Sequence, residues 1–280
     1  MIEWLERAGE TPLLSAVTAT LASGWFATSL GAVPALLLPQ LSLGTSTVLI
    51  SVAAGLMLGA SIFALLLPAL EAAGAGVGGA AFGATAAVTA ALLCGALALA
   101  AANEWIPHEH FVKGRDPEAR GGATGAVIPR AVLFAVAIAI HNFPEGLSVG
   151  IGAASGDAQL SGTLLLAMAL QNLPEGLVVA LGLRGAGFSR GQAFGLASAT
   201  GFLEVVGGFA GGASLAVSAH LLQCALAFAA GAMLYVISDE IIPESHRPGL
   251  EARATASLFA GLAAFLLIDA LVQDWAATLE

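Results

Sequence analysis

The sequence HNFPEGL at residues 141–147 returns, little changed, as QNLPEGL at residues 171–177. Each copy continues into apolar residues, so each places polar and ionisable side chains inside a stretch that otherwise has the composition of a membrane span. Charged side chains cost free energy in the hydrocarbon core, and ionisable residues found there usually mark a functional site. The repeated phrase therefore predicts a site built by two neighbouring helices.

The amino-acid composition is typical of a polytopic membrane protein. Of the 280 residues, 58% are hydrophobic and only 10% are charged, which is far from the balance of a soluble domain. The net charge of −10 is no argument for a soluble partner, because the location of each charge matters more in a membrane protein. Cys94 and Cys224 lie within apolar runs, which predicts small core residues and no disulfide. The acidic N-terminus, followed by a long apolar run, predicts no cleaved targeting segment.

Eight apolar runs are long enough to cross a bilayer, which takes about 20 helical residues. They cover approximately residues 13–38, 47–72, 79–103, 129–153, 161–184, 191–213, 219–239 and 254–274. We therefore predict an all-α fold with eight transmembrane helices, forming one transmembrane domain over residues 1–280. A polar loop, residues 104–128, separates the third span from the fourth.

The basic residues predict the orientation, because short loops rich in Lys and Arg stay in the cytoplasm. Eight of the nine basic residues fall in or beside three alternate loops, those between spans three and four, five and six, and seven and eight. Only Arg7 lies elsewhere. We therefore expect a multi-pass protein of the inner (plasma) membrane, with both termini outside and the loop 104–128 in the cytoplasm.

The two phrases are predicted to meet near the middle of the bilayer. At a rise of about 1.5 Å per residue, the first begins roughly 12 residues into span four and the second roughly 10 residues into span five, which runs the opposite way. Within each phrase the first polar residue and the glutamate are four apart, so both project from one helical face. A third glutamate lies at a similar depth in span six. The predicted cluster is His141, Asn142, Glu145, Gln171, Asn172, Glu175 and Glu204.

Three neighbouring carboxylates in a medium of low dielectric must be protonated, paired or neutralised by cations. No Lys or Arg lies in the interior of a predicted span, so protons and metal ions remain. Imidazole mixed with carboxylate and amide oxygens suits zinc, with iron, manganese and cadmium as competitors, and suits copper(I) less well. Met57 in span two is a candidate for one additional, softer ligand.

A proline interrupts each phrase. Pro144 cannot donate to the carbonyl of Ile140, and Pro174 cannot donate to that of Leu170, so kinks are predicted in the fourth and fifth helices. Broken helices at membrane depth are tolerated where they line a cavity or a binding site. Each freed carbonyl is a candidate to bind the metal or a water molecule.

At these residues the chain resembles the ZIP (Zrt/Irt-like) family of divalent-metal transporters, and most of all its bacterial GufA-like branch. The fold of that family has eight transmembrane helices with both termini outside, and helices four and five carry His-Asn-x-Pro-Glu-Gly and a related copy, here residues 141–146 and 171–176. The resemblance implies a transporter and not an enzyme, one that moves zinc into the cytoplasm, with cadmium, iron and manganese as other substrates. It implies no organic cofactor and no nucleic-acid partner, and it leaves a homodimer open.

The resemblance also implies the ligands of a binuclear site. His141, Glu145 and Glu175 would hold one ion, and the two glutamates would bridge to a second ion held by Asn142, Gln171, Asn172 and Glu204. Some relatives have histidine at the position of Gln171 and an acidic residue at that of Asn172, so one ion or two remain open. The family resemblance further suggests movement of one helix bundle against another. The glycines that follow in span six, Gly207, Gly208, Gly211 and Gly212, would serve such sliding or static close packing equally well.

Further candidates for the metal path flank the central cluster. On the inner side they are His108 and His110, in a loop that resembles the histidine-bearing loop of the family, with Glu240 and His246 at the inner end of span seven. Asp269 lies about 15 residues into span eight, toward the outside. A methionine that some members place in span two would here be Met57, or be replaced by Ser61. The alternative for the loop residues is an ordinary solvated surface.

Two other functions remain open from the sequence. An intramembrane metal-dependent hydrolase would also bury His and Glu ligands, but its His-Glu-x-x-His pattern is absent from the chain. A cation or proton channel would use Glu145, Glu175 and Glu204 as a relay. Saturable uptake with competition among divalent metals would distinguish a carrier from a channel.

Overall fold

The computed structural model describes residues 11–38, 42–74, 81–105, 109–110, 114–115, 130–217 and 222–278. Long helices make up nearly all of this, so the predicted all-α class is confirmed. The helical segments are α2 (Pro12–Thr20), η1 (Leu21–Phe26), α3 (Ala27–Ala32), η2 (Val33–Leu36), α4 (Leu43–Gly59), η3 (Ala60–Leu66), α5 (Leu67–Ala72), α6 (Ala81–Trp105), α7 (Arg130–Ala154), α8 (Ala158–Gly185), α9 (Arg190–Val217), α10 (Leu222–Val236), η6 (Ile237–Ile241), α11 (Ile242–Ser245) and α12 (Glu251–Ala277). One antiparallel pair of two-residue strands, β1 (Glu109–His110) and β2 (Gly114–Arg115), falls within the predicted loop 104–128, most of which lies outside the described residues.

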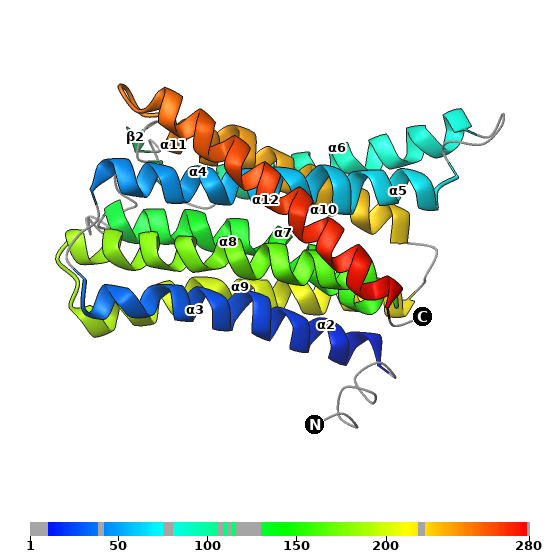
Figure 1. Cartoon of the computed structure of the whole chain (residues 1–280), viewed down its shortest axis with the longest axis horizontal. Helices are drawn as coiled ribbons and strands as arrows, with labels where there is room; N and C mark the ends of the chain where they lie inside the picture. The colour runs from blue at the N-terminus through cyan, green and yellow to red at the C-terminus, as the bar shows by residue number, and fades with distance from the viewer. Residues whose placement is uncertain are drawn as a thin grey trace.

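Seven segments of the described chain are long and apolar enough to cross a membrane. They are Pro12–Leu36, Leu43–Ala72, Phe82–Ala102, Ala158–Gly185, Arg190–Leu215, Leu222–Ile241 and Glu251–Trp275. The protein is therefore a multi-pass membrane protein. α7 is not one of the seven, although it packs along α8 and α9, so the total of eight spans stays a prediction. The start of α2 and the end of α12 lie at the same end of the bundle, as an even number of crossings requires (Figure 1).

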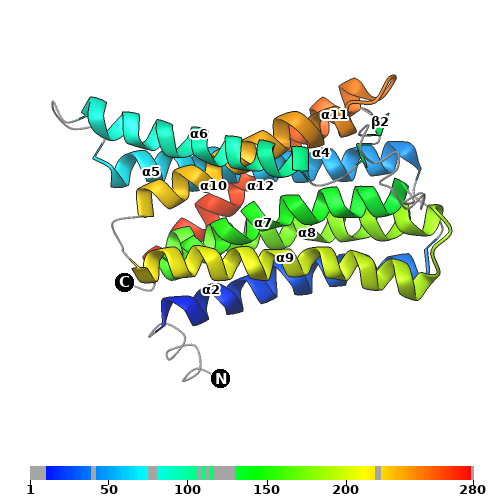
Figure 2. The same ribbon diagram turned by 180° about the vertical axis from the view of Figure 1, so that it is seen from behind.

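Helices α7 and α8 run through the middle of the bundle (Figure 1). On one side of them lie α2, α3 and α9, and on the other lie α4, α6, α10 and α12, an arrangement that Figure 2 shows from behind. The most extensive helix pairings are α7 with α9, α4 with α12, α6 with α10 and α3 with α8. The two helices that carry the repeated phrase are therefore enclosed by the others.

Glycines set the closest helix pairings. Gly55 of α4 lies against the backbone of Leu258 in α12, and Gly261 of α12 lies against the backbone of Val52 in α4, so a Cβ at either glycine would run into the facing helix. The same reciprocal arrangement joins α6 to α10 and α3 to α8, through Gly95, Gly231, Gly31 and Gly176. Small residues are what allow transmembrane helices to approach this closely.

Three spans contain a π-helical turn in place of regular α-helix: η1 in the first, η3 between α4 and α5, and η6 between α10 and α11. Such turns are rare and occur frequently at functional sites. By contrast, α7 and α8 continue as helices through Pro144 and Pro174. The kinks expected at these prolines stay a prediction.

Candidate metal-binding site

The two repeated phrases lie inside the bundle, on α7 and α8. Six of the seven predicted ligands are buried, and Glu175 is partly buried. The carboxyl groups also lie near one another, since the charge of Glu145 interacts with those of Glu175 and Glu204, and the charge of Glu175 interacts with His141. The structure thus brings together side chains from α7, α8 and α9 that the sequence placed at one depth.

The close approach of α7 and α9 positions this cluster. Gly146 of α7 lies against the backbone carbonyl of Glu204, and Gly207 of α9 lies against the backbone of Phe143. The four glycines of span six that the sequence singled out divide between two neighbours: Gly207 and Gly211 face α7, and Gly208 and Gly212 face α2. All four therefore serve close packing, which holds Glu204 beside the α7 phrase.

The cluster contains many buried polar atoms that lack a hydrogen bond of normal length and angle, although Gln171 lies beside Glu145 and Asn142 beside Glu175. These are both side-chain polar atoms of Asn142, Glu145 and Gln171, together with Nδ1 of His141, Oδ1 of Asn172 and Oε1 of Glu175. The hydroxyl of Thr28, which lies beside Glu204, also belongs to this set, and elsewhere in the described residues the hydroxyls of Thr47 and Ser51 share the property. Nearly all buried polar groups in proteins are paired, and an unpaired one costs about 1–3 kcal/mol. Such a concentration of unpaired donors and acceptors at one place indicates a binding site for a polar or charged species.

Glu204 is held by an amide from the neighbouring helix. Asn172 Nδ2 donates to both carboxyl oxygens of Glu204, at 3.0 Å each, and to the backbone carbonyl of Ser23 in η1, at 2.7 Å. The side chain of Glu204 also packs against Gly24, where a Cβ would meet its Oε2 at 2.6 Å. The first span therefore forms one wall of the site, a contribution that the sequence did not reveal.

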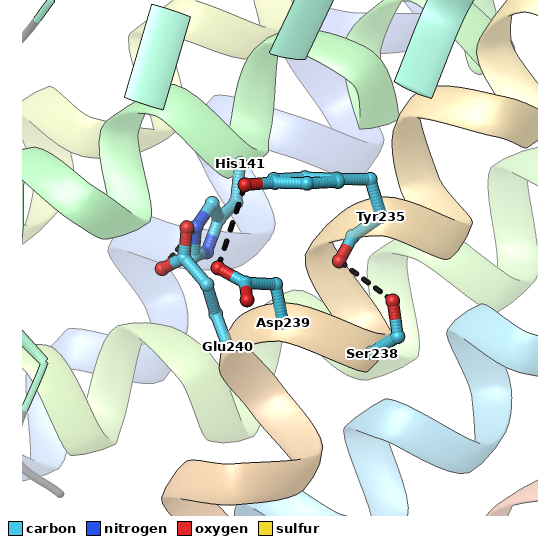
Figure 3. Close-up of polar contacts among 5 residues, drawn as sticks. All are labelled: His141, Tyr235, Ser238, Asp239 and Glu240. Carbon is cyan, nitrogen blue, oxygen red and sulfur yellow. Dashed lines mark hydrogen bonds and ion pairs between the residues drawn. The ribbon is translucent and has the colours of Figure 1, made fainter. Parts of the chain in front are cut away.

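His141 forms an ion pair with Glu240, a residue of η6. The His141 Nε2 and the Glu240 Oε2 are 2.7 Å apart, and both side chains are buried. Figure 3 shows the Glu240 carboxyl beside the imidazole, with Asp239 and Tyr235 next to it. Tyr235 OH donates weakly to Asp239, at 3.5 Å. The sequence placed Glu240 at the inner end of span seven, apart from the central cluster, and the structure brings it to the first predicted ligand.

The remaining path candidates lie in ordinary structural contacts. Met57 is buried in the hydrophobic core, and the hydroxyl of Ser61 donates to its carbonyl at 2.8 Å. Asp269 accepts hydrogen bonds from Thr163 and Gln273. His246 pairs with the hydroxyls of Ser245 and Thr255 and with the carbonyl of Ile242. His108 lies outside the described residues, and of His110 only the backbone, in β1, is described.

Within the described residues, no three His, Cys, Asp or Glu side chains are gathered closely enough to form a ready-made metal site. Two members of the cluster are held by other contacts: His141 is paired with Glu240, and the Glu204 carboxyl accepts from Asn172. Amide oxygens of Asn142, Gln171 and Asn172 would have to complete the coordination of a metal ion. Zinc and other first-row divalent ions accept imidazole and oxygen ligands of this kind.

The chain matches the family model described as ZIP Zinc transporter over residues 101–269, a range that contains both repeated phrases and Glu204. It is 42% identical to Zinc transporter GufA of Myxococcus xanthus over 243 residues, which cover 87% of this chain and 93% of that protein. It is 40% identical to Zinc transporter ZIPB of Bordetella bronchiseptica over 248 residues, or 89% of this chain and 78% of the relative. Zinc transporter ZIP11 of Homo sapiens is 43% identical over 146 residues, half of this chain and 43% of the human protein.

Proposed function

This chain belongs to the ZIP zinc transporter family, its GufA-like branch, and we propose on that basis that it carries zinc across the inner membrane into the cytoplasm. The protein is a transporter and not an enzyme. The outside location of both termini rests on the distribution of basic residues between alternate loops. The inward direction rests on the resemblance to the family. Cadmium, iron and manganese are proposed as further substrates, because the same ligand types accept them.

The unpaired polar atoms of the repeated phrases carry this proposal. We assign the first ion to His141, Glu145 and Glu175, and a second ion, bridged by the two glutamates, to Asn142, Gln171, Asn172 and Glu204. Each of these residues except Glu204 has at least one polar atom that is buried and without a partner. A divalent ion supplies at once the partner that these atoms lack and the positive charge that neighbouring carboxylates need in a medium of low dielectric.

The charge balance favours two ions. Glu145, Glu175 and Glu204 carry three negative charges when ionised. Glu240 adds a fourth when its partner His141 is neutral, as an imidazole must be to bind a metal. Two zinc ions would neutralise four carboxylates, whereas one would leave two negative charges uncompensated in the membrane interior.

The path is proposed to extend from this centre in both directions. Glu240, in contact with His141, is the first group on the inner side, and His246 and the loop histidines His108 and His110 follow it. Asp269, on the outer half of α12, is proposed to attract cations to the entrance.

Uptake of zinc into proteoliposomes tests the proposal. Wild-type protein should give saturable uptake that cadmium inhibits competitively, and the double variant Glu145→Gln, Glu175→Gln should lose at least about tenfold in rate, which corresponds to one lost metal contact of about 1.4 kcal/mol. Glu251→Gln is the matched control, because Glu251 is an exposed acidic residue at the start of α12. Uptake by the double variant at the wild-type rate would refute the site, and a non-saturating current would favour a channel.

A further inference from the structure

The amide of Asn172 is turned in one direction by its surroundings. Its nitrogen faces the carbonyl oxygen of Ser23 and the two carboxyl oxygens of Glu204. A backbone carbonyl can accept a hydrogen bond but cannot donate one, so the contact with Ser23 alone fixes which end of the amide faces this side. Only the NH₂ end of the amide can therefore face this wall, and both of its hydrogens are used there.

The oxygen end of the same amide must then point away from the wall. Asn172 Oδ1 is buried and has no hydrogen-bond partner. Asn172 follows Gln171 directly and lies one helical turn before Glu175, so its oxygen belongs to the same cluster of unpaired atoms. A buried, neutral and unpaired carbonyl oxygen in such a cluster is suited to a divalent cation.

The wall itself is made by the π-helical turn η1. The Ser23 hydroxyl donates to the carbonyl of Ala19 within its own helix, so it is the backbone carbonyl of Ser23 that reaches Asn172. The next residue, Gly24, has no Cβ, and a Cβ there would lie 2.6 Å from both Cβ and Oε2 of Glu204. The Ser23–Gly24 peptide thus touches both members of the Asn172–Glu204 pair.

We propose that the Ser23–Gly24 peptide of η1 is a positioning element, which fixes Asn172 as a neutral oxygen ligand of the transported ion. This inference rests on the proposed transport of zinc through the site. In this chain the same wall disfavours an ionised carboxylate at position 172, because it would face the carbonyl oxygen of Ser23, an obligate acceptor, with no hydrogen to donate. The first span thereby limits the negative charge of the site.

Substitution of Asn172 by Asp separates this role from simple ligation. If Asn172 acted only through its oxygen, Asp would provide an equal or stronger ligand and the KM for zinc uptake would stay or fall. With the wall in place, the KM of Asn172→Asp should rise about tenfold and be no lower than that of Asn172→Ala, in line with the loss of a buried hydrogen bond. A zinc KM for Asn172→Asp below that of Asn172→Ala would overturn the proposal.

A second variant leaves position 172 intact and alters the wall. Gly24→Ala should displace the Ser23 carbonyl and Glu204, and so raise the zinc KM severalfold while Vmax per folded transporter stays within about twofold. Gly182→Ala, in α8 with open space around its Cβ, is the control and should match the wild type. An unchanged KM in folded Gly24→Ala would contradict the proposal, and if that variant does not fold, the position-172 series decides alone.

The two proposals fail separately. If the double variant Glu145→Gln, Glu175→Gln took up zinc at the wild-type rate, the assignment of the transport site would be refuted, and this inference with it. If that double variant lost uptake while the zinc KM of Asn172→Asp were below that of Asn172→Ala, the site assignment would be supported and only the role of η1 would be refuted.

Discussion

The Nε2 atom of His141 on α7 lies 2.7 Å from the Oε2 atom of Glu240 on η6, and both side chains are buried. The pair (Figure 3) joins α7, in the middle of the bundle, to η6, which continues α10 in the layer that also contains α4, α6 and α12 (Figure 1). Removing the Glu240 carboxyl would leave the buried imidazole without this partner, and a buried polar group that loses its partner is destabilised.

Glu240→Gln should therefore slow zinc uptake by about tenfold or more, since His141 loses its ionic partner and the metal loses one compensating charge. Initial rates in proteoliposomes, normalised to folded transporter, measure the effect. Glu251→Gln, an exposed change of the same kind on α12, should leave the rate unaltered. Equal rates for the two variants would show that the His141–Glu240 pair has no part in transport.

Glu204→Gln should reduce uptake while the protein remains as stable as the wild type. The variant removes a buried negative charge, and its amide oxygen can still accept a hydrogen bond from Asn172. Zinc uptake and thermal unfolding in detergent, measured on the same preparation, test the two halves of this prediction. A large fall in unfolding temperature would mean that Glu204 serves mainly the fold.

Gly55→Ala and Gly261→Ala should each destabilise the protein, by about 1–3 kcal/mol as for other overpacked sites. A methyl group at either position would meet the backbone of the opposite helix, which cannot move aside as a flexible side chain can. Gly83→Ala in α6 has open space around its Cβ and is the control. Thermal unfolding in detergent is the measurement, and equal unfolding temperatures for all three variants would contradict the close packing of α4 with α12.

Zinc uptake should slow as the external solution is acidified from about pH 7.5 to about pH 5.5, because imidazole and carboxylate groups must lose their protons before they bind a metal. Protons and zinc then compete for the same atoms, so the effect should appear mainly as a rise in KM. Uptake rates at several zinc concentrations for each pH provide the test. A fall in Vmax alone, at constant KM, would place the proton effect outside the binding site.

The positions of the helices were predictable because each span needs a long apolar run. The predicted span 161–184 corresponds to the observed helix α8 (Ala158–Gly185), and the predicted span 191–213 corresponds to α9 (Arg190–Val217). The gathering of Glu145, Glu175 and Glu204 also followed from helical rise on spans of opposite direction. These features depend on local composition and on regular geometry, both of which a sequence carries.

Other contacts were not predictable, for identifiable reasons. The apolar run of span seven stops at residue 239, so the sequence predicted that Glu240 lies where the helix ends and a loop begins. In the structure the helical chain continues through η6 and α11 to Ser245. The contact of Asn172 with Ser23 uses a backbone carbonyl, which has the same chemistry in every residue and leaves no signal in the sequence. The π-helical turns occur in spans other than those that contain Pro144 and Pro174, where the kinks stay a prediction.

The π-helical turn η6 has a consequence for insertions and deletions. A π turn accommodates one more residue than an α turn, so it resembles a single-residue insertion tolerated within a helix. Deleting one residue of η6 on the N-terminal side of Glu240 would therefore restore regular α-helix and leave Glu240 facing nearly the same way relative to α10. The apolar register of Leu222–Val236 and the contact of the carboxyl group with His141 would both be kept, so η6 is a place in this span where a single-residue deletion should be tolerated.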